Sequence, residues 1–323
     1  MKLRTEIEKI ELNFKLDHSQ KGLSLGSCFA ENIASRLKRL RFDVCSNPFG
    51  ILYNPASICS VLERVGQNRD FTENELFEHN NLWHSELHHG DFSSENPQDT
   101  LQIINSRYKE GVNALKNSSY VIITLGTAWV YKNAITGQVV GNCHKRAASD
   151  FTRHRLSVEE IISMLKKQIE GSLSGKKIII TVSPIRHIKD TLEGNSLSKA
   201  TLILAAQTLK ELYPERVNYF PSFEILNDDL RDYRFYKSDM IHPSDQAVDY
   251  VWSLFQEAVF SLETSTLNKQ IDSLVSSSEH RVLKPNSPSH KVFCQRMSEK
   301  TMALKQQNPE LKLDDLEQYF TSF

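Results

Sequence analysis

The sequence has almost no excess of charge of either sign. Its 323 residues contain 39 lysines and arginines against 40 aspartates and glutamates, which gives a formal net charge of −1. Broad electrostatic attraction to nucleic acid or to an anionic membrane needs a basic excess. The composition therefore argues against both as partners.

Long apolar runs are also missing. No stretch approaches the roughly 20 apolar residues that span a bilayer. Residues 1–16 alternate charged and apolar side chains and lack the apolar core of a secretory signal. A cytoplasmic protein without a membrane segment is the resulting expectation.

Cysteine is scarce, and its spacing shows no pairing. The five cysteines lie far apart, with no C-x-x-C pair among them. An odd number of cysteines, in a chain long enough to bury a core, predicts reduced thiols rather than a disulfide framework. Zinc held by cysteine is disfavoured for the same reason.

What the sequence does contain is an alternation of short apolar runs and amphipathic segments. The runs at 120–125 (YVIITL) and 177–182 (KIIITV) are typical of strands covered on both faces in a parallel sheet. Further strands are predicted at 22–26, 42–44 and 217–220, and helices at 28–40, 55–65, 98–115, 157–173, 196–212 and 245–260. This alternation predicts a three-layer α/β fold built on a doubly wound, flavodoxin-like parallel sheet of about five strands.

The character of the chain changes after Phe260. Residues 264–279 are serine-rich and amphipathic, and residues 292–307 predict one more helix. We therefore divide the chain into a main domain, residues 1–261, and a helical C-terminal appendage, residues 262–323. The helical spacing of its apolar residues leads us to expect that the appendage packs on the main domain or on a second subunit.

Two long insertions interrupt the main domain, at residues 66–97 and 127–155. Loops of this length inside a compact domain usually serve a functional site. Within the second insertion, residues 129–140 predict a hairpin that turns at Thr136 and Gly137.

Ser27 stands at the turn between the first predicted strand and the first predicted helix. Ligands of doubly wound sheets bind beyond the carboxyl ends of the strands, and a helix N-terminus offers backbone N–H groups to an anion. A serine at this point has the surroundings that an acyl-transfer nucleophile and part of an oxyanion hole require. The alternative is that Ser27 only caps the helix, the commonest role of serine at such a position.

Asp239 and His242, in the segment SDMIHP, form a second signal. Residues three apart in a turn have Cβ atoms roughly 5–6 Å from each other. One tight segment can therefore hold a carboxylate beside an imidazole, where the carboxylate sets the tautomer and supports the imidazolium. Pro243 ends the loop, and Ser244 is predicted to cap the last helix of the main domain.

Other reactive side chains have simpler explanations. Cys28 at a helix N-terminus would be stabilised as a thiolate, but a small residue that packs inward is the simpler interpretation. His84 and His88 are four residues apart, as in helical zinc pairs. Gly90 and the missing third ligand favour a surface or substrate-lining loop instead, so no metal site is predicted.

A basic cluster and one further histidine are also candidates for contact with substrate. Lys145, Arg146, Arg153 and Arg155 either receive an anionic group or coat the surface of a solvated insertion. His187, which follows a buried strand, either contacts substrate or is a hydrogen-bonded structural histidine.

These signals occur together in a known family. The hexapeptide LGSCFA at residues 25–30 resembles the signature of the GSCFA domain family, a branch of the SGNH/GDSL hydrolases. Further segments similar to this family follow in order: NPFG (47–50), YNP (53–55), LGTAW (125–129), NCHK (142–145), VSP (182–184) and DMIHPS (239–244). The resemblance covers residues 20–260, most of the chain.

The resemblance implies a site of the SGNH type. Ser27 would be the nucleophile, His242 the general base and then the general acid, and Asp239 the residue that orients His242. The backbone N–H groups of Ser27 and Gly50 would form the oxyanion hole.

One departure from the superfamily concerns its third oxyanion donor. The superfamily usually places an asparagine just after the glycine of its third block, where this sequence has Thr127 after Gly126. Asn142, brought back by the predicted hairpin, is the candidate replacement, and Thr127 and His144 are further candidate substrate-binding residues. One lost donor costs on the order of 10²–10³ in rate.

The sequence therefore predicts a serine ester hydrolase that works through an acyl-enzyme and needs no metal or organic cofactor. By family analogy, the predicted substrate is a carbohydrate that carries a small acyl group such as acetyl. An acyltransferase with the same nucleophile, or a non-catalytic carbohydrate- or partner-binding module on the same fold, are the alternatives.

Overall fold

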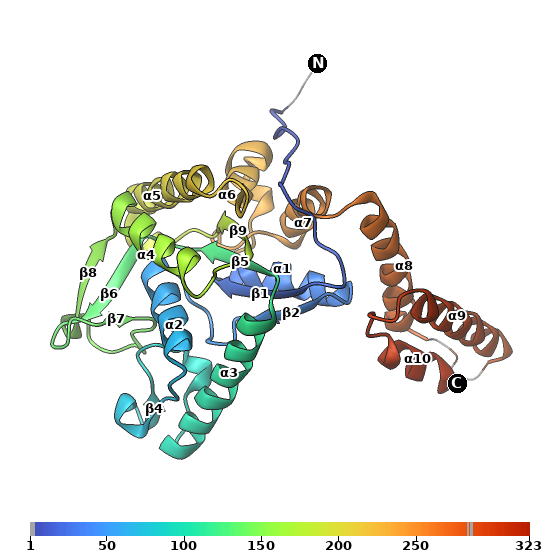
Figure 1. The fold of residues 1–323 in the computed structure, drawn as a ribbon, viewed down its shortest axis with the longest axis horizontal. Helices are drawn as coiled ribbons and strands as arrows, with labels where there is room; N and C mark the ends of the chain where they lie inside the picture. Colours follow the sequence, from blue (N-terminus) through green and yellow to red (C-terminus); the bar gives the residue numbers. More distant parts are fainter. Residues whose placement is uncertain (1–3, 283, 285–286) are drawn as a thin grey trace.

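A computed structural model of the chain describes residues 4–282, 284 and 287–323. At its centre lies a sheet of five parallel strands in the order β2–β1–β5–β9–β10 (Figure 1). The strands are β1 (Lys21–Gly26), β2 (Asp43–Ser46), β5 (Tyr120–Leu125), β9 (Lys177–Val182) and β10 (Val217–Phe220). This is the strand order of flavodoxin-like doubly wound sheets. The prediction of an α/β fold with a five-stranded parallel sheet is confirmed.

Helices cover both faces of the sheet. They are α1 (Cys28–Arg39), α2 (Pro55–Gln67), α3 (Pro97–Asn117), α4 (Val158–Glu170), α5 (Thr191–Leu212), the short α6 (Ser222–Glu224) and α7 (Asp245–Val259). Val121 and Ile123 of β5 share one core with α2, α3, α4 and α5, whereas Tyr120 and Ile122 lie in a second core with α1 and α7. Successive side chains of a strand point to opposite faces, so the sheet becomes the middle of three layers. Within the described residues, no helix has the length and apolar character that a membrane crossing requires.

Side-chain caps begin two helices where the sequence predicts them. Ser157 and Glu160 form a capping box before α4. The Oγ atom of Ser244 accepts the N–H of Ala247 at the start of α7. By contrast, α5 begins at Thr191, earlier than the predicted start at residue 196, because its first turn contains a glycine and lacks a clear apolar stripe.

The two insertions carry small antiparallel sheets. The first holds β3 (Phe77–His79) and β4 (Leu82–His84), and the second holds β6 (Trp129–Asn133), β7 (Val139–Val140) and β8 (Phe151–Arg155). The predicted hairpin over residues 129–140 is confirmed by the pairing of β6 with β7. The third strand, β8, was not predicted, because its sequence FTRHR is polar and mostly exposed.

The C-terminal segment forms α8 (Leu262–Glu279), α9 (Pro288–Gln307) and α10 (Asp314–Thr321), which lie to one side of the main body in Figure 1. Their apolar side chains pack in a core of their own, and α10 was not predicted. Contacts with the main body include ion pairs of Arg39 with Asp272 and Glu279 and of Arg41 with Asp315, and a hydrogen bond from Arg39 to Oγ of Ser276. The segment therefore contacts the main domain through polar side chains, while its apolar faces pack on one another. Packing on a second subunit stays a prediction.

The turn from β1 into α1 depends on Gly26. Its φ of +133° is a conformation that L side chains rarely adopt, and a Cβ there would lie 2.1 Å from the carbonyl oxygen of Thr124 on β5. The N–H of Gly26 donates to Oδ1 of Asn47 at 2.9 Å. Only glycine permits this approach of the two backbones, and the approach sets the position of Ser27.

We expect Gly26→Ala to lower the free energy of unfolding by about 3 kcal/mol or more, because backbone strain adds to the clash with Thr124. Gly175→Ala is the matched control: its φ is +76°, but nothing lies within 4 Å of its Cβ position. Strain alone should cost about 1 kcal/mol there. Urea denaturation measures the free energy of unfolding of both variants. Equal losses in the two variants would contradict the claim that Gly26 is needed for the close approach of β1 to β5.

Candidate active site

Ser27 is the N-cap of α1 and is almost fully buried, with 1% of its surface exposed. Its Oγ atom accepts the N–H of Phe29 at 3.3 Å, and its own N–H donates to the carbonyl of Thr124 at 3.2 Å. Ser27 therefore caps α1. Capping does not consume the hydroxyl proton, because a hydroxyl oxygen can accept one hydrogen bond while donating another.

Asp239 and His242 form the hydrogen-bonded pair that their spacing predicts. Nδ1 of His242 lies 2.7 Å from Oδ2 of Asp239, while Oδ1 of Asp239 accepts the N–H groups of Ile241 and His242 at 2.8 and 2.9 Å. Met240 turns the chain between them with a left-handed φ of +57°.

The charge state of this pair follows from its hydrogen bonds. The N–H groups of His242 and Ile241, followed by the imidazole, lower the pKa of Asp239 to about 2. The ionised carboxylate then holds a proton on Nδ1 of His242, which leaves Nε2 as the basic nitrogen. Among the described residues, Nε2 has no hydrogen-bond partner.

A cavity of about 700 Å³ is lined by residues that follow β5 and β9 and by the insertion that contains β6, β7 and β8. His242 lines this cavity, and so does Cys28, the residue next to Ser27. Other side chains in the wall are Tyr53, Asn54, Thr127, Asn142, His144 and His187, with Trp129, Tyr131 and Phe151 among the aromatic ones. The cavity therefore contains the base and borders the predicted nucleophile.

Gly126, at the end of β5, connects Ser27 to this wall. A Cβ on Gly126 would lie 3.5 Å from Cβ of Ser27, 3.3 Å from Nε2 of His187 and 2.9 Å from the carbonyl oxygen of Tyr53. Because Gly126 has no side chain, Ser27 and the cavity residues Tyr53 and His187 meet around it. Burial, followed by the charge of Lys199, lowers the pKa of His187 to about 3, so its ring is neutral.

The predicted substrate-binding residues differ in their placement. Thr127, Asn142 and His144 line the cavity, whereas Gly50 is not part of its wall. The N–H of Gly50 donates to the carbonyl of Asn47 at 2.9 Å. Both predicted backbone donors, on Ser27 and Gly50, are thus committed to other carbonyls in this structure, and Gly50 is not an open oxyanion donor.

Most of the predicted histidines are engaged in the framework of the insertions. The ring nitrogens of His84 contact Ser93 and the carbonyl of His79, and His88 contacts Ser85. Nε2 of His144 contacts the carbonyl of Ser85 at 2.8 Å, and burial lowers the pKa of His144 to about 4. Across the described ranges, no cluster of three or more histidine, cysteine or acidic side chains is arranged to hold a metal ion.

Lys199 supports the strand ends at the site and Asn54 lines the cavity, although the sequence analysis assigned a role to neither. Lys199 is buried on α5, and its Nζ donates to the carbonyls of Gly126 and Ser183 at 2.6 Å each. It ties together the ends of β5 and β9, and burial lowers its pKa to about 7. In the sequence, Lys199 stands at helical spacing from Leu202 and other apolar residues of α5. This spacing could have predicted that the lysine is buried.

Asn54 caps α2 in the same way that Ser27 caps α1. Its Oδ1 atom accepts the N–H of Ser57 at 2.8 Å, and only 6% of the residue is exposed. Nδ2 of this amide has no hydrogen-bond partner among the described residues, and the side chain lines the cavity. The motif YNP predicts that Asn54 caps a helix. It does not reveal that the side chain of Asn54 also lines a cavity.

Cys28 does not have the surroundings of a reactive thiolate. Burial raises its pKa, and the charge of Glu31 adds to that rise. A thiol that stays protonated is a weak nucleophile. Its position next to Ser27 therefore does not make it a competing nucleophile.

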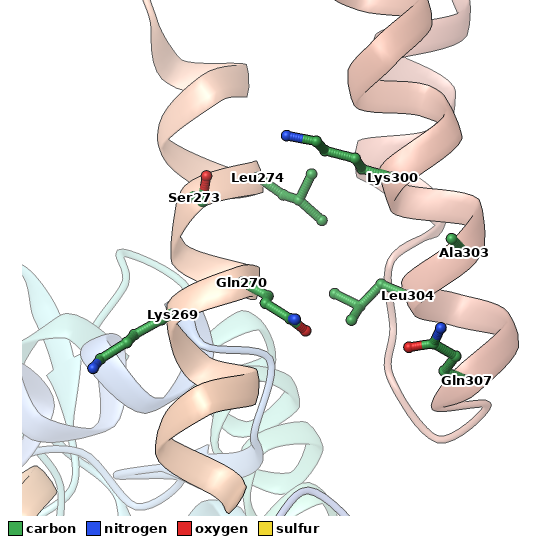
Figure 2. A pocket seen from close by; sticks show the side chains of 8 residues that line it. All are labelled: Lys269, Gln270, Ser273, Leu274, Lys300, Ala303, Leu304 and Gln307. Carbon is green, nitrogen blue, oxygen red and sulfur yellow. The ribbon is translucent and has the colours of Figure 1, made fainter.

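A second hollow, of about 510 Å³, lies between α8 and α9. Figure 2 shows Leu274 of α8 and Leu304 of α9 directed toward each other across it, with amides and lysines around them. Its lining contains neither a carboxylate nor an imidazole, so it offers no base to a nucleophile.

Two family models match different parts of the chain. The model of the GSCFA family matches residues 21–255, and that of the GSCFA domain protein, C-terminal domain, matches residues 271–323. No curated protein matches the chain. Since the first match covers well over half of the sequence, the chain belongs to the GSCFA family.

Proposed function

We propose that the protein is a serine ester hydrolase of the SGNH type, with Ser27, His242 and Asp239 as its triad. The observation that carries this proposal is the imidazole–carboxylate pair at 2.7 Å, whose histidine lines the cavity that borders the N-terminus of α1. A base fixed by a carboxylate, a serine hydroxyl and a helix N-terminus are the parts that acyl transfer needs.

In the proposed reaction, Oγ of Ser27 attacks the ester carbonyl while Nε2 of His242 takes the hydroxyl proton. His242 then gives this proton to the leaving alcohol, and an acyl-enzyme remains on Ser27. Water, deprotonated by the same nitrogen, attacks the acyl-enzyme and releases the acid. Asp239 remains ionised throughout, because its pKa of about 2 lies far below the working pH.

The oxyanion requires donors other than those of Ser27 and Gly50. The N–H of Cys28 has no acceptor among the described residues, and it lies in the first turn of α1, where the helix dipole favours negative charge. The free Nδ2 of Asn54 is the second donor in this proposal, since Asn54 follows Tyr53, whose carbonyl holds the N–H groups of Gly126 and Thr127.

The lining of the cavity bears on the substrate. Aromatic rings, amides and cationic side chains make up much of its wall, beside the aliphatic side chains of Val140, Ile185, Ile188 and Ile241. Such a wall suits a hydroxyl-rich molecule better than a long alkyl chain. We therefore propose that the ester joins a small acyl group, such as acetyl, to a carbohydrate.

Hydrolysis of a short-chain chromogenic ester tests the nucleophile. We expect Ser27→Ala to lower kcat by about 10³-fold or more, because the acyl-enzyme can no longer form. Cys28→Ala is the matched control and should keep most of the activity, since its thiol stays protonated. Equal rates in wild type and Ser27→Ala, with both folded, would contradict the proposal. So would loss of activity in Cys28→Ala alone.

A pair of asparagine variants tests the side-chain donor. Asn54→Asp keeps an oxygen to cap α2 but removes the amide N–H groups, so we expect kcat to fall by about 10²–10³-fold. Asn142→Asp keeps the oxygen that accepts the N–H of His144 and should have a much smaller effect. The reverse order of the two losses, measured by steady-state kinetics, would make Asn142 the donor instead.

A further inference from the structure

The cavity is strongly electropositive although the chain as a whole is nearly neutral. Five cationic residues line it, against a single acidic one, Asp190. The five are Lys145, Arg146, Arg153, Arg186 and Lys189. In a protein with a net charge of −1, this is a local concentration of positive charge in a concave site, which attracts anions.

Two of the five cations are neutralised by the protein. Arg146 forms an ion pair with Glu86 at 2.6 Å, and Arg153 forms one with Asp190. Both guanidinium groups also lie over aromatic rings, Arg146 over Phe151 and Arg153 over Trp129. These two arginines therefore belong to the framework of the cavity.

Arg186 is different because it is half-buried and has no carboxylate partner among the described residues. Its guanidinium lies over the rings of Tyr236 and Tyr233, at 4.2 and 5.3 Å from their centres. Charged side chains that leave water are normally paired. A guanidinium held over aromatic rings is restrained in position, and its planar fork can bind a carboxylate or a phosphate through two parallel hydrogen bonds.

The position of Arg186 links it to the catalytic histidine. Its backbone N–H donates to the carbonyl of Ile241 at 3.4 Å, and Ile241 precedes His242. Lys189, from the same loop as Arg186, and Lys145, from the insertion, line the same cavity and form no ion pair in the described part of the chain. Three uncompensated cations therefore share the cavity with the proposed base.

We propose that the cavity contains an anion subsite, in which Arg186, with help from Lys189 and Lys145, binds a carboxylate or phosphate group of the substrate. This inference rests on the proposed function, and it narrows the substrate to the ester of an acidic sugar. The ester is presented to Ser27 while the anionic group is bound by Arg186.

Three matched esters test the subsite: methyl glucoside, methyl glucuronide and phosphorylated methyl glucoside, each with one acetyl group on the same hydroxyl. We expect wild type to prefer at least one anionic ester over the neutral one by about tenfold or more in kcat/KM. Arg186→Gln should abolish this preference, so that the ratio of kcat/KM between the anionic and the neutral esters falls to about one. The better of the two anionic esters identifies the group as a carboxylate or a phosphate.

Arg155→Gln is the control for the loss of one positive charge, because Arg155 hydrogen-bonds Thr201 and is not part of the cavity wall. It should leave the preference intact. No preference in wild type, or an equal loss on all three esters in Arg186→Gln, would overturn the anion subsite.

A binding measurement separates this inference from the proposed hydrolysis. Calorimetric titration of Ser27→Ala with the acetylated glucuronide and the acetylated phosphate should show binding that weakens about tenfold in the Ser27→Ala, Arg186→Gln double variant. Such binding without turnover in wild type would support the subsite and contradict the hydrolase. Absence of binding by both anions would contradict the subsite whatever the activity.

Discussion

Parallel pairing between β1, β5 and β9 is the constraint on which the site depends. Because the strands run in the same direction, their carboxyl ends meet at one edge of the sheet, and each is followed by a residue of the site. Ser27 follows β1, Gly126 follows β5, and Ser183, whose carbonyl binds Lys199, follows β9. Close approach of β1 to β5 is possible because Gly26 has no side chain, and the missing side chain of Gly126 admits the carbonyl of Tyr53.

Two glycines and a buried lysine thus bring the ends of β1, β5 and β9 together at the site. The N-termini of α1 and α2, capped by Ser27 and Asn54, approach the same cavity. Capping uses only the side-chain oxygen of each residue. The hydroxyl proton of Ser27 and the Nδ2 group of Asn54 can still donate hydrogen bonds. Structural caps and the proposed chemistry therefore use different atoms of the same side chains.

Local patterns in the sequence predicted the parts of the fold that depend on neighbouring residues. The strands β5, β9 and β10 were predicted at their observed bounds, because a buried strand of a parallel sheet is a continuous apolar run. The contact between Asp239 and His242 was predicted for a similar reason, since the two residues lie three apart in one turn.

The features that were not predicted depend on contacts between distant segments or have only weak local sequence patterns. Lys199 reaches its two carbonyl acceptors only once α5 has packed against the sheet. The strand β8 and the helix α10 are short and polar, and neither contains an apolar run. The prediction for Gly50 failed although a local signal was present. In NPFG, a proline in the second position and a glycine in the fourth favour a turn that uses the N–H of that glycine.

The central claim is that Ser27 is a nucleophile activated by His242. The most direct measurement is covalent labelling of the folded protein with a fluorophosphonate, followed by intact-mass and peptide mass spectrometry. The account predicts one adduct per chain, located on Ser27 and largely lost in His242→Ala. A protein that stays unlabelled, or an adduct on Cys28 or another residue in place of Ser27, would contradict it.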